Sequence, residues 1–191
     1  MKNNKIQTKI VAGKYKGVSL DLPSLESTRS TKSIMKESLF NTLQFDIVDE
    51  NFVEVFGGSG SMGLEALSRG AKHSYFIELD KNAYETLRAN CIKVSAKDTT
   101  CINGNSFKEF PKLLKQIDRA SFFYIDPPFS IREGMQDIYE NVFSLIEDIP
   151  KELVLLIIVE HMSPLVMPQT IGSFEKKKTK KFGKSSLSYY A

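Results

Sequence analysis

From residue 51 onward the sequence alternates short apolar runs, rich in β-branched and aromatic residues, with longer amphipathic stretches. This alternation is typical of βα units that build a parallel sheet covered by helices. The run 153–159 is apolar without alternation, which suits a central strand buried on both faces. We therefore predict an α/β fold. The expected strands are 51–56, 74–79, about 100–103, 121–125 and 153–160, and the expected helices are 31–43, 62–69, 81–94, 105–116 and 133–146.

Two segments at the ends of the chain do not follow this pattern, and both are basic. Residues 9–22 hold two strand-like runs around Gly13 and Gly17, and residues 172–190 hold two runs that turn near Gly183, so each segment predicts a β-hairpin. The net charge of +3 is too small to indicate a nucleic-acid partner, but its distribution is uneven. The cationic residues of the two ends are Lys2, Lys5, Lys9, Lys14, Lys16, Arg29, Lys32 and Lys36, and Lys176, Lys177, Lys178, Lys180, Lys181 and Lys184.

A glycine-rich turn follows the first strand of the alternating region. Residues 53–63 run from a buried strand through this turn into a helix, and glycines there let backbone amides approach a ligand closely. Glu78 ends the next strand, 20 residues after Gly58, which is the spacing at which a carboxylate accepts hydrogen bonds from ribose hydroxyls. The pair predicts an adenosine-containing cofactor and leaves a dinucleotide open. The alternative is a ligand-free turn beside a surface carboxylate.

The tetrapeptide Asp126-Pro127-Pro128-Phe129 follows the fourth strand, where open α/β sheets place ligands. Two prolines fix the backbone and remove two N–H donors, so the nearby oxygens form a rigid cluster of acceptors. Such a cluster suits an exocyclic base amino group, which donates two hydrogen bonds, to Asp126 and to the Pro127 carbonyl. Phe129 is expected to stack on the base. The alternative is a strand-terminating turn with a core phenylalanine.

Four stretches of the chain together carry a family resemblance: 10–17 (IVAGKYKG), 35–41 (MKESLFN), 63–71 (GLEALSRGA) and the tetrapeptide. With them the chain resembles the class I S-adenosylmethionine-dependent methyltransferases, and specifically the RsmD-type 16S rRNA guanine-N2 methyltransferases. The resemblance implies a Rossmann-like fold with a mostly parallel seven-stranded sheet flanked by helices. It also implies a small N-terminal extension of hairpin plus helix over residues 1–45, followed by a methyltransferase domain over residues 46–191.

The resemblance further implies S-adenosylmethionine as the cofactor, no metal, and roles for particular residues. The expected catalytic residues are Asp126, Pro127, Pro128 and Phe129. The expected cofactor-binding residues are Glu54, Gly58, Ser59, Gly60, Glu78, Leu79, Asn105 and Ser106, and the expected RNA-binding residues are Lys14, Lys16, Arg29, Lys36 and Asn41.

The chain departs from the family pattern at several of these positions. Glu54 stands where aspartate is usual, Gly57 where alanine is usual, and Ser30 where proline follows the arginine. Lys36 stands where arginine is common, and Asn105 replaces an acidic residue that contacts the adenine amino group. An asparagine oxygen still accepts that hydrogen bond. These departures do not change the expected class of reaction, methyl transfer. They concern the exact identity of the substrate.

We expect an enzyme that methylates guanine N2 in 16S rRNA, within the 30S subunit or an assembly intermediate, because the chain has little RNA-binding surface of its own. The alternatives are a DNA adenine-N6 or cytosine-N4 methyltransferase and a non-catalytic rRNA-binding assembly factor. The first is disfavoured because no insertion in the chain is long enough to form a separate DNA-recognition domain. Asp126 and Glu78 argue against the last. We also expect a monomer in the cytoplasm, because no run approaches the roughly 20 apolar residues that cross a bilayer and the N-terminus is polar.

Overall fold

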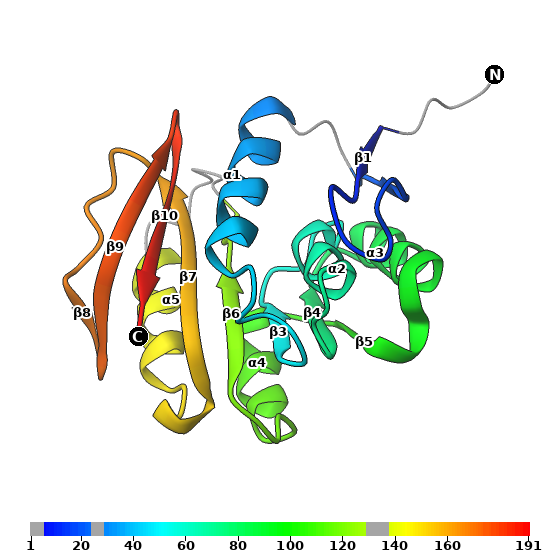
Figure 1. Cartoon of the computed structure of the whole chain (residues 1–191). Helices are drawn as coiled ribbons and strands as arrows, with labels where there is room; N and C mark the ends of the chain where they lie inside the picture. The colour runs from blue at the N-terminus through cyan, green and yellow to red at the C-terminus, as the bar shows by residue number, and fades with distance from the viewer. Residues whose placement is uncertain (1–5, 24–28, 129–137) are drawn as a thin grey trace.

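The computed structural model describes residues 6–23, 29–128 and 138–191 (Figure 1). Within these residues the centre of the molecule is an eight-stranded sheet with the order β5-β4-β3-β6-β7-β10-β9-β8. Its strands are β3 (Asn51–Glu54), β4 (His73–Glu78), β5 (Thr99–Asn103), β6 (Ser121–Ile125), β7 (Val154–Met162), β8 (Thr170–Ile171), β9 (Phe174–Phe182) and β10 (Ser185–Tyr190).

The sheet has a parallel part and an antiparallel part. Strands β5, β4, β3, β6 and β7 pair in parallel, whereas β10, β9 and β8 continue the sheet beyond β7 as antiparallel strands. The mostly parallel class I fold is thus confirmed, and so is the C-terminal hairpin, which is formed by β9 and β10. The expected count of seven strands omitted β8, because two residues are too few to show a strand pattern.

Five α-helices of the described residues cover both faces of the sheet (Figure 1). They are α1 (Arg29–Thr42), α2 (Ser61–Ser68), α3 (Lys81–Ser95), α4 (Ser106–Leu114) and α5 (Ile138–Glu147), with short 3-10 turns at Ala96–Asp98 and Lys151–Leu153. Each lies within a stretch predicted to be helical, give or take two residues at the ends, while residues 133–137 of the last prediction lie outside the described residues. No helix in the described part of the chain has the length and apolar character needed to span a membrane.

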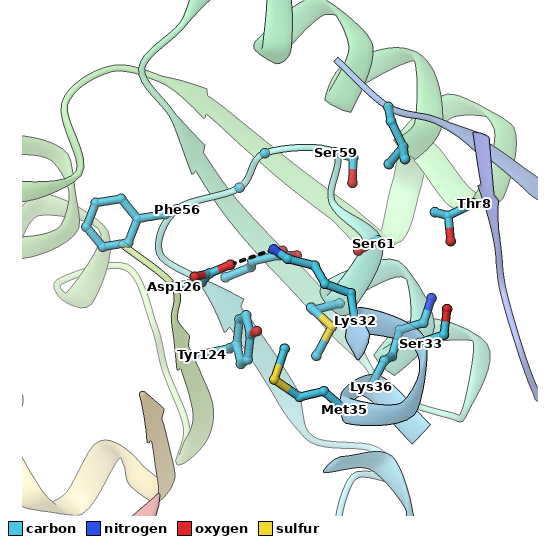
Figure 2. Close-up of a pocket in the computed structure, with 15 residues that line it drawn as sticks. Thr8, Lys32, Ser33, Met35, Lys36, Phe56, Ser59, Ser61, Tyr124 and Asp126 are labelled. Carbon is cyan, nitrogen blue, oxygen red and sulfur yellow. Dashed lines mark hydrogen bonds and ion pairs between the residues drawn. The ribbon is translucent and has the colours of Figure 1, made fainter. Parts of the chain in front are cut away.

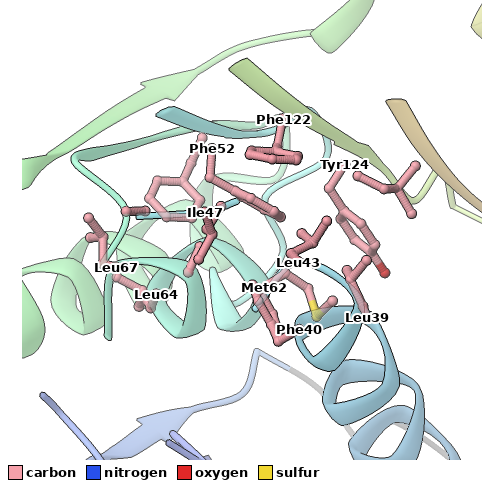
Figure 3. Close-up of a cluster of buried hydrophobic side chains, with 14 of the residues drawn as sticks. Leu39, Phe40, Leu43, Ile47, Phe52, Met62, Leu64, Leu67, Phe122 and Tyr124 are labelled. Carbon is pink, nitrogen blue, oxygen red and sulfur yellow. The ribbon is translucent and has the colours of Figure 1, made fainter. Parts of the chain in front are cut away.

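Alternating side chains of the strands pack into two separate hydrophobic cores, one on each face of the sheet. Phe52 of β3 and Tyr124 of β6 pack with α1, α2 and α3 on one face, and their neighbours Val53 and Phe123 pack with α4 and α5 on the other. Figure 3 shows the first core, in which Phe40 of α1 lies near Phe52, with ring centroids 5.9 Å apart. Burying a side chain of this size stabilises the fold by about 1.5–3 kcal/mol. Helix α1 is therefore an integral part of this core.

The predicted N-terminal hairpin is present, with β1 (Gln7–Lys9) antiparallel to β2 (Ser19–Asp21). Its strands are shorter than the apolar runs indicated, and the loop between them docks on α2. The fully buried carboxylate of Glu65 accepts hydrogen bonds from the amides of Val11 and Ala12, at 2.8 and 3.1 Å. The Ser68 hydroxyl accepts from the Tyr15 amide at 2.9 Å. Buried polar contacts of this kind fix the hairpin against the body, because breaking one leaves a desolvated group without a partner.

Candidate active site

The candidate site lies where the chain reverses its direction across the sheet. From β3 the chain moves outward to β4 and β5, then returns to β6 on the other side of β3. In such sheets ligands bind outside the carboxyl ends of the strands at this switch point. The glycine turn after β3 and the Asp126 segment after β6 therefore meet at one edge, as the sequence predicts.

A cavity of about 710 Å³ opens on the β4 side of this edge. Two aromatic rings line it, Phe56 after β3 and Phe107 in α4, with centroids 5.7 Å apart in an edge-to-face arrangement. The side chain of Leu79, which is 65% exposed, adds further apolar surface. The polar lining includes five residues that the sequence singled out, together with Asp80 and Lys81, which it did not. The five are Gly58, Glu78, Asn105, Ser106 and Asp126.

The Glu78 carboxylate is held in place at the floor of this large cavity. Its Oε2 accepts a hydrogen bond from the Gly58 amide at 2.7 Å, and its Oε1 accepts from the Asp80 amide at 2.8 Å. Each carboxylate oxygen has a second lone pair, so both can accept one hydrogen bond more. Gly58 has a φ of 51°, and a Cβ there would meet nothing within 4 Å. The turn thus leaves its outer side open to a ligand that carries two neighbouring hydroxyls.

Asn105 and Ser106 line the same cavity but already have local partners. The Asn105 side-chain oxygen caps α4 by accepting from the Phe107 amide at 2.9 Å. The Ser106 hydroxyl donates to the Val55 carbonyl at 2.7 Å. Their side chains thus fix the start of α4, and the asparagine oxygen keeps one lone pair for a ligand. Gly60 is buried inside the turn, where its amide donates to the Gly57 carbonyl at 2.7 Å.

A second, much smaller hollow of about 70 Å³ lies on the other side of Asp126 (Figure 2). Lys32 of α1 points into it, and its Nζ lies 3.2 Å from Asp126 Oδ2. Glu54 and Ser59, two of the predicted cofactor residues, line this small hollow and not the large cavity. Asp126 lines both, so it stands at the junction of two differently sized spaces.

Two buried glutamates lie close to Asp126. Glu54 accepts a hydrogen bond from the Gly63 amide at 2.8 Å, and burial raises its pKa to about 8, with the Asp126 charge adding to the shift. Glu160 of β7 accepts from the Tyr124 hydroxyl at 2.5 Å, and burial, followed by the Asp126 charge, raises its pKa to about 8. At neutral pH both glutamates are therefore protonated, whereas Asp126 forms an ion pair with Lys32.

The remaining predicted site residues fall into three groups. Pro128 lines the large cavity and Pro127 is buried behind it, while Phe129 lies outside the described residues. The predicted RNA-binding residues Lys14, Lys16 and Asn41 are exposed, and Arg29 is the first residue of α1.

Lys36 has a different environment from the one its predicted role requires. It is 4% exposed, its Nζ lies 3.6 Å from Glu65 and donates to the Lys9 carbonyl, and burial lowers its pKa. Because its ammonium is held by Glu65 and by the Lys9 carbonyl, Lys36 lines a small inner hollow and is not exposed at the surface of the protein.

Sequence reasoning did not select four residues that the structure brings to the site: Lys32, Phe56, Phe107 and Glu160. Phe107 directly follows the selected Ser106, and Phe56 lies two positions from both Glu54 and Gly58, so their positions were informative. Glu160 ends the apolar run of the central strand, and a carboxylate at the carboxyl end of a parallel strand is a signal for a site. Lys32 had no comparable signal, because only the packing of α1 brings it to Asp126.

Comparisons with known proteins identify the family of this chain. Residues 8–191 match the family model described as conserved hypothetical protein 95. The chain is 31% identical over 182 residues to ribosomal RNA small subunit methyltransferase D of Haemophilus influenzae, covering 93% of this chain and 91% of the relative.

Solved structures share the fold as well. One is "Putative methyltransferase yhhF from Escherichia coli", with a TM-score of 0.75 and 30% identity over 97% of both chains. Another, SMU.776, described as "a putative methyltransferase complexed with SAH", has a TM-score of 0.62 and 11% identity over 93% of this chain and 52% of that one, a likeness of fold alone. This chain therefore belongs to the conserved hypothetical protein 95 family, the RsmD family.

Proposed function

We propose that this protein transfers a methyl group from S-adenosylmethionine to the exocyclic N2 of a guanine in small-subunit (16S) rRNA. One observation carries the proposal: Asp126 stands between a cavity lined by the Glu78 carboxylate and a second hollow on its other side. A methyl transferase needs this arrangement, because donor and acceptor must meet at one point from different sides. The name of the Haemophilus influenzae relative supports rRNA as the acceptor.

The residues of the large cavity fit S-adenosylmethionine. Glu78 offers two acceptor positions for the ribose hydroxyls, and the rings of Phe56 and Phe107 with Leu79 offer apolar walls for the adenine. The open side of Gly58 gives backbone approach to the rest of the ligand. When bound there, S-adenosylmethionine supplies an electrophilic methyl group on a positively charged sulfur.

Asp126 acts on the acceptor nitrogen. The nitrogen lone pair of guanine N2 is delocalised into the ring, so the amino group is a poor nucleophile. Accepting its two hydrogens, at the Asp126 carboxylate and the Pro127 carbonyl, localises the lone pair toward the methyl carbon. A nitrogen–carbon bond forms as the carbon–sulfur bond breaks with its electrons on sulfur, and the nitrogen then gives up one proton, which the carboxylate accepts. Lys32 must move away from Asp126 before the amino group can take its place.

The RNA reaches this site as an extruded nucleotide, because the reacting nitrogen is inaccessible within a stacked helix. The exposed lysines Lys14 and Lys16 on the hairpin contact phosphates around it, and we propose RNA contacts for Asn41 and Arg29 of α1 as well. This surface is small, so an assembled 30S particle or an assembly intermediate presents the nucleotide in position. We propose that a monomer performs this reaction in the cytoplasm, where ribosomes are assembled.

The deciding experiment supplies the purified protein with S-adenosylmethionine labelled at the methyl group. The acceptors are free 16S rRNA, 30S particles that lack methylation by this enzyme, and double-stranded DNA, and the labelled nucleoside is identified after digestion. We expect N2-methylguanosine from the 30S particles. Label in adenine or cytosine of DNA would replace the proposal with DNA methylation, and particle binding without label in any acceptor would support a non-catalytic assembly factor.

A further inference from the structure

Glu160 lies beside Asp126 because of the register between β6 and β7. The two strands are parallel, and Ile125 pairs with Val159, so Asp126 and Glu160 are the next positions along the pair. Alternation along the strand directs Glu160 to the sheet face that α1 covers. Its side chain is fully buried. A carboxyl group in such a place is costly unless it is neutral or paired.

The oxygens of Glu160 are unequally satisfied. Oε2 accepts the Tyr124 hydroxyl, whereas the buried Oε1 has no hydrogen-bond partner among the described residues. The neighbouring side chain across the β6–β7 pair is Asp126, and its contact with Glu160 contributes to the raised pKa of Glu160. Two ionised carboxylates offer each other acceptors alone, so this contact requires a proton on one of them. A proton on Oε1 turns the unsatisfied acceptor into a donor toward Asp126.

The proton belongs on Glu160. The Asp126 side chain is 18% exposed and forms the ion pair with Lys32, and both features favour its charged form. Glu160 has no exposed surface and forms no ion pair among the described residues; the charge of Lys32 lowers its pKa, but desolvation is the larger effect and favours its neutral form. The raised pKa of about 8 agrees with this division of the two carboxyls.

We infer that Glu160 is a positioning residue, which as a neutral acid donates a hydrogen bond from Oε1 and so holds the Asp126 carboxylate in the orientation that accepts the target amino group. The inference rests on the proposed function. It adds a residue that lines neither the large cavity nor the small hollow, because Glu160 acts through Asp126. When Glu160 ionises, its own negative charge repels Asp126 and the donor is lost. Methyl transfer should therefore decline as the pH rises through about 8.

Few other groups around this pair titrate in the same range. The surrounding elements contribute Lys32 from α1, Glu54 from β3, Tyr124 from β6 and Tyr139 from α5. Burial raises the pKa of Tyr124 far above its usual value and that of Tyr139 to about 12, so both stay protonated. His161, the next residue of β7, instead contacts Ser188 at 2.9 Å. Glu54, with a pKa of about 8, titrates in the same range and also interacts with Asp126, so Glu54→Gln measures its share of any pH dependence.

The test measures the rate of methyl transfer at saturating cofactor and RNA between about pH 6 and pH 9, on the substrate that the parent protein methylates. Glu160→Leu removes the donor, and we expect the rate to fall roughly 10- to 100-fold at every pH. Glu160→Gln keeps a donor that cannot ionise, so it should recover most of that loss and abolish the decline near pH 8. Glu54→Gln should retain the decline. Titration of the RNA itself cancels in the ratio of variant to parent.

Two results would overturn the inference: a decline that persists in Glu160→Gln, or a rate in Glu160→Leu equal to the parent's. A second measurement needs neither RNA nor activity. Because the folded-state pKa is raised, Glu160 stabilises the fold most below its unfolded pKa, and this contribution is lost as the pH rises from about 4.5 to about 8. In this pH range the ionisation of Glu160 should raise the equilibrium constant for unfolding in urea about tenfold per pH unit. Glu160→Gln should remove this contribution to the pH dependence of stability.

This second measurement separates two kinds of failure. An inactive parent protein would refute the proposed function, while the urea slope would still report on the proton. An unchanged slope in Glu160→Gln would show that the proton is not on Glu160, whatever the activity.

Discussion

The two spaces that meet at Asp126 are built from different parts of the chain. The large cavity is lined by residues between Phe56 and Ile138, all from the sheet and the helices that follow its strands. The small hollow takes much of its lining from the first 45 residues: Thr8 and Leu22 from the hairpin, and Lys32, Ser33, Met35 and Lys36 from α1 (Figure 2). The large cavity therefore belongs to the body of the fold, whereas the small hollow is shared between the body and the N-terminal segment.

The large cavity and the small hollow also differ in whether a ligand can enter without rearrangement of side chains. At about 710 Å³ with a fixed carboxylate, the large cavity is ready for a ligand of the size of S-adenosylmethionine. The small hollow of about 70 Å³ is occupied by charged side chains, with Lys32 on Asp126. A base enters only after these side chains rearrange. We propose that residues 1–45 form a unit that shapes the substrate side, and residues 46–191 a unit that holds the donor.

The largest expected effect is at the junction of the two spaces. Asp126→Ala removes the charged acceptor aligned on the reacting nitrogen, and we expect kcat to fall by about 10² to 10³. Cofactor affinity, measured by calorimetry, should change little because Glu78 and the glycine turn hold the donor. Asp126→Asn, which keeps the shape, should lose less. A variant that lost cofactor binding instead would move Asp126 to the donor side and erase the contrast between the spaces.

The next effect is confined to the cofactor side. Glu78→Ala removes the acceptors for two ribose hydroxyls and also leaves the Gly58 amide without its partner. We expect the Kd for S-adenosylmethionine to rise at least 30- to 100-fold, equivalent to about 2–3 kcal/mol. Binding of the protein to 30S particles should stay close to the parent value. Unchanged cofactor affinity would mean that the large cavity holds something other than an adenosine.

The sequence predicts the two spaces unequally, for a physical reason. Gly58, Glu78 and Asp126 lie at strand ends, and a parallel sheet brings strand ends together whatever the rest of the chain does. The contacts of Lys32 and Lys36 depend instead on how α1 packs across the sheet, which no local pattern encodes. Lys36 shows the limit clearly: the family resemblance implied that it binds RNA, whereas packing places its ammonium against the buried Glu65. Tertiary contacts thus decide the substrate side, and local patterns decide the cofactor side.

A third variant, Gly13→Ala, displaces the hairpin and so tests the substrate side of the site separately from the cofactor side. Gly13 has a φ of 83°, and a Cβ there would lie 1.7 Å from the Ser68 carbonyl oxygen, so Gly13→Ala cannot keep the loop on α2. We expect roughly 1–3 kcal/mol of lost stability in urea and a fall of about tenfold in kcat/KM for RNA. Cofactor affinity should be unaffected.

Gly17→Ala is the control for this variant. Gly17 has nearly the same φ, 87°, but a Cβ there would meet nothing within 4 Å. It therefore carries the backbone strain without the clash. Equal loss of methylation in both variants would attribute the effect to strain alone and would remove the hairpin from the substrate side.

The smallest effect is expected at the outer surface of that side, where Lys14 and Lys16 are exposed on the hairpin loop. If each neutralises one RNA phosphate, replacing both by alanine should weaken binding several-fold and lower the slope of log Kd against log salt by roughly 1.5. Lys115→Ala with Lys151→Ala is the control, because both are exposed in the segments that lead into the amino ends of β6 and β7, opposite the site. An identical slope in the two double variants would leave the hairpin as a structural support of the hollow, with RNA held elsewhere.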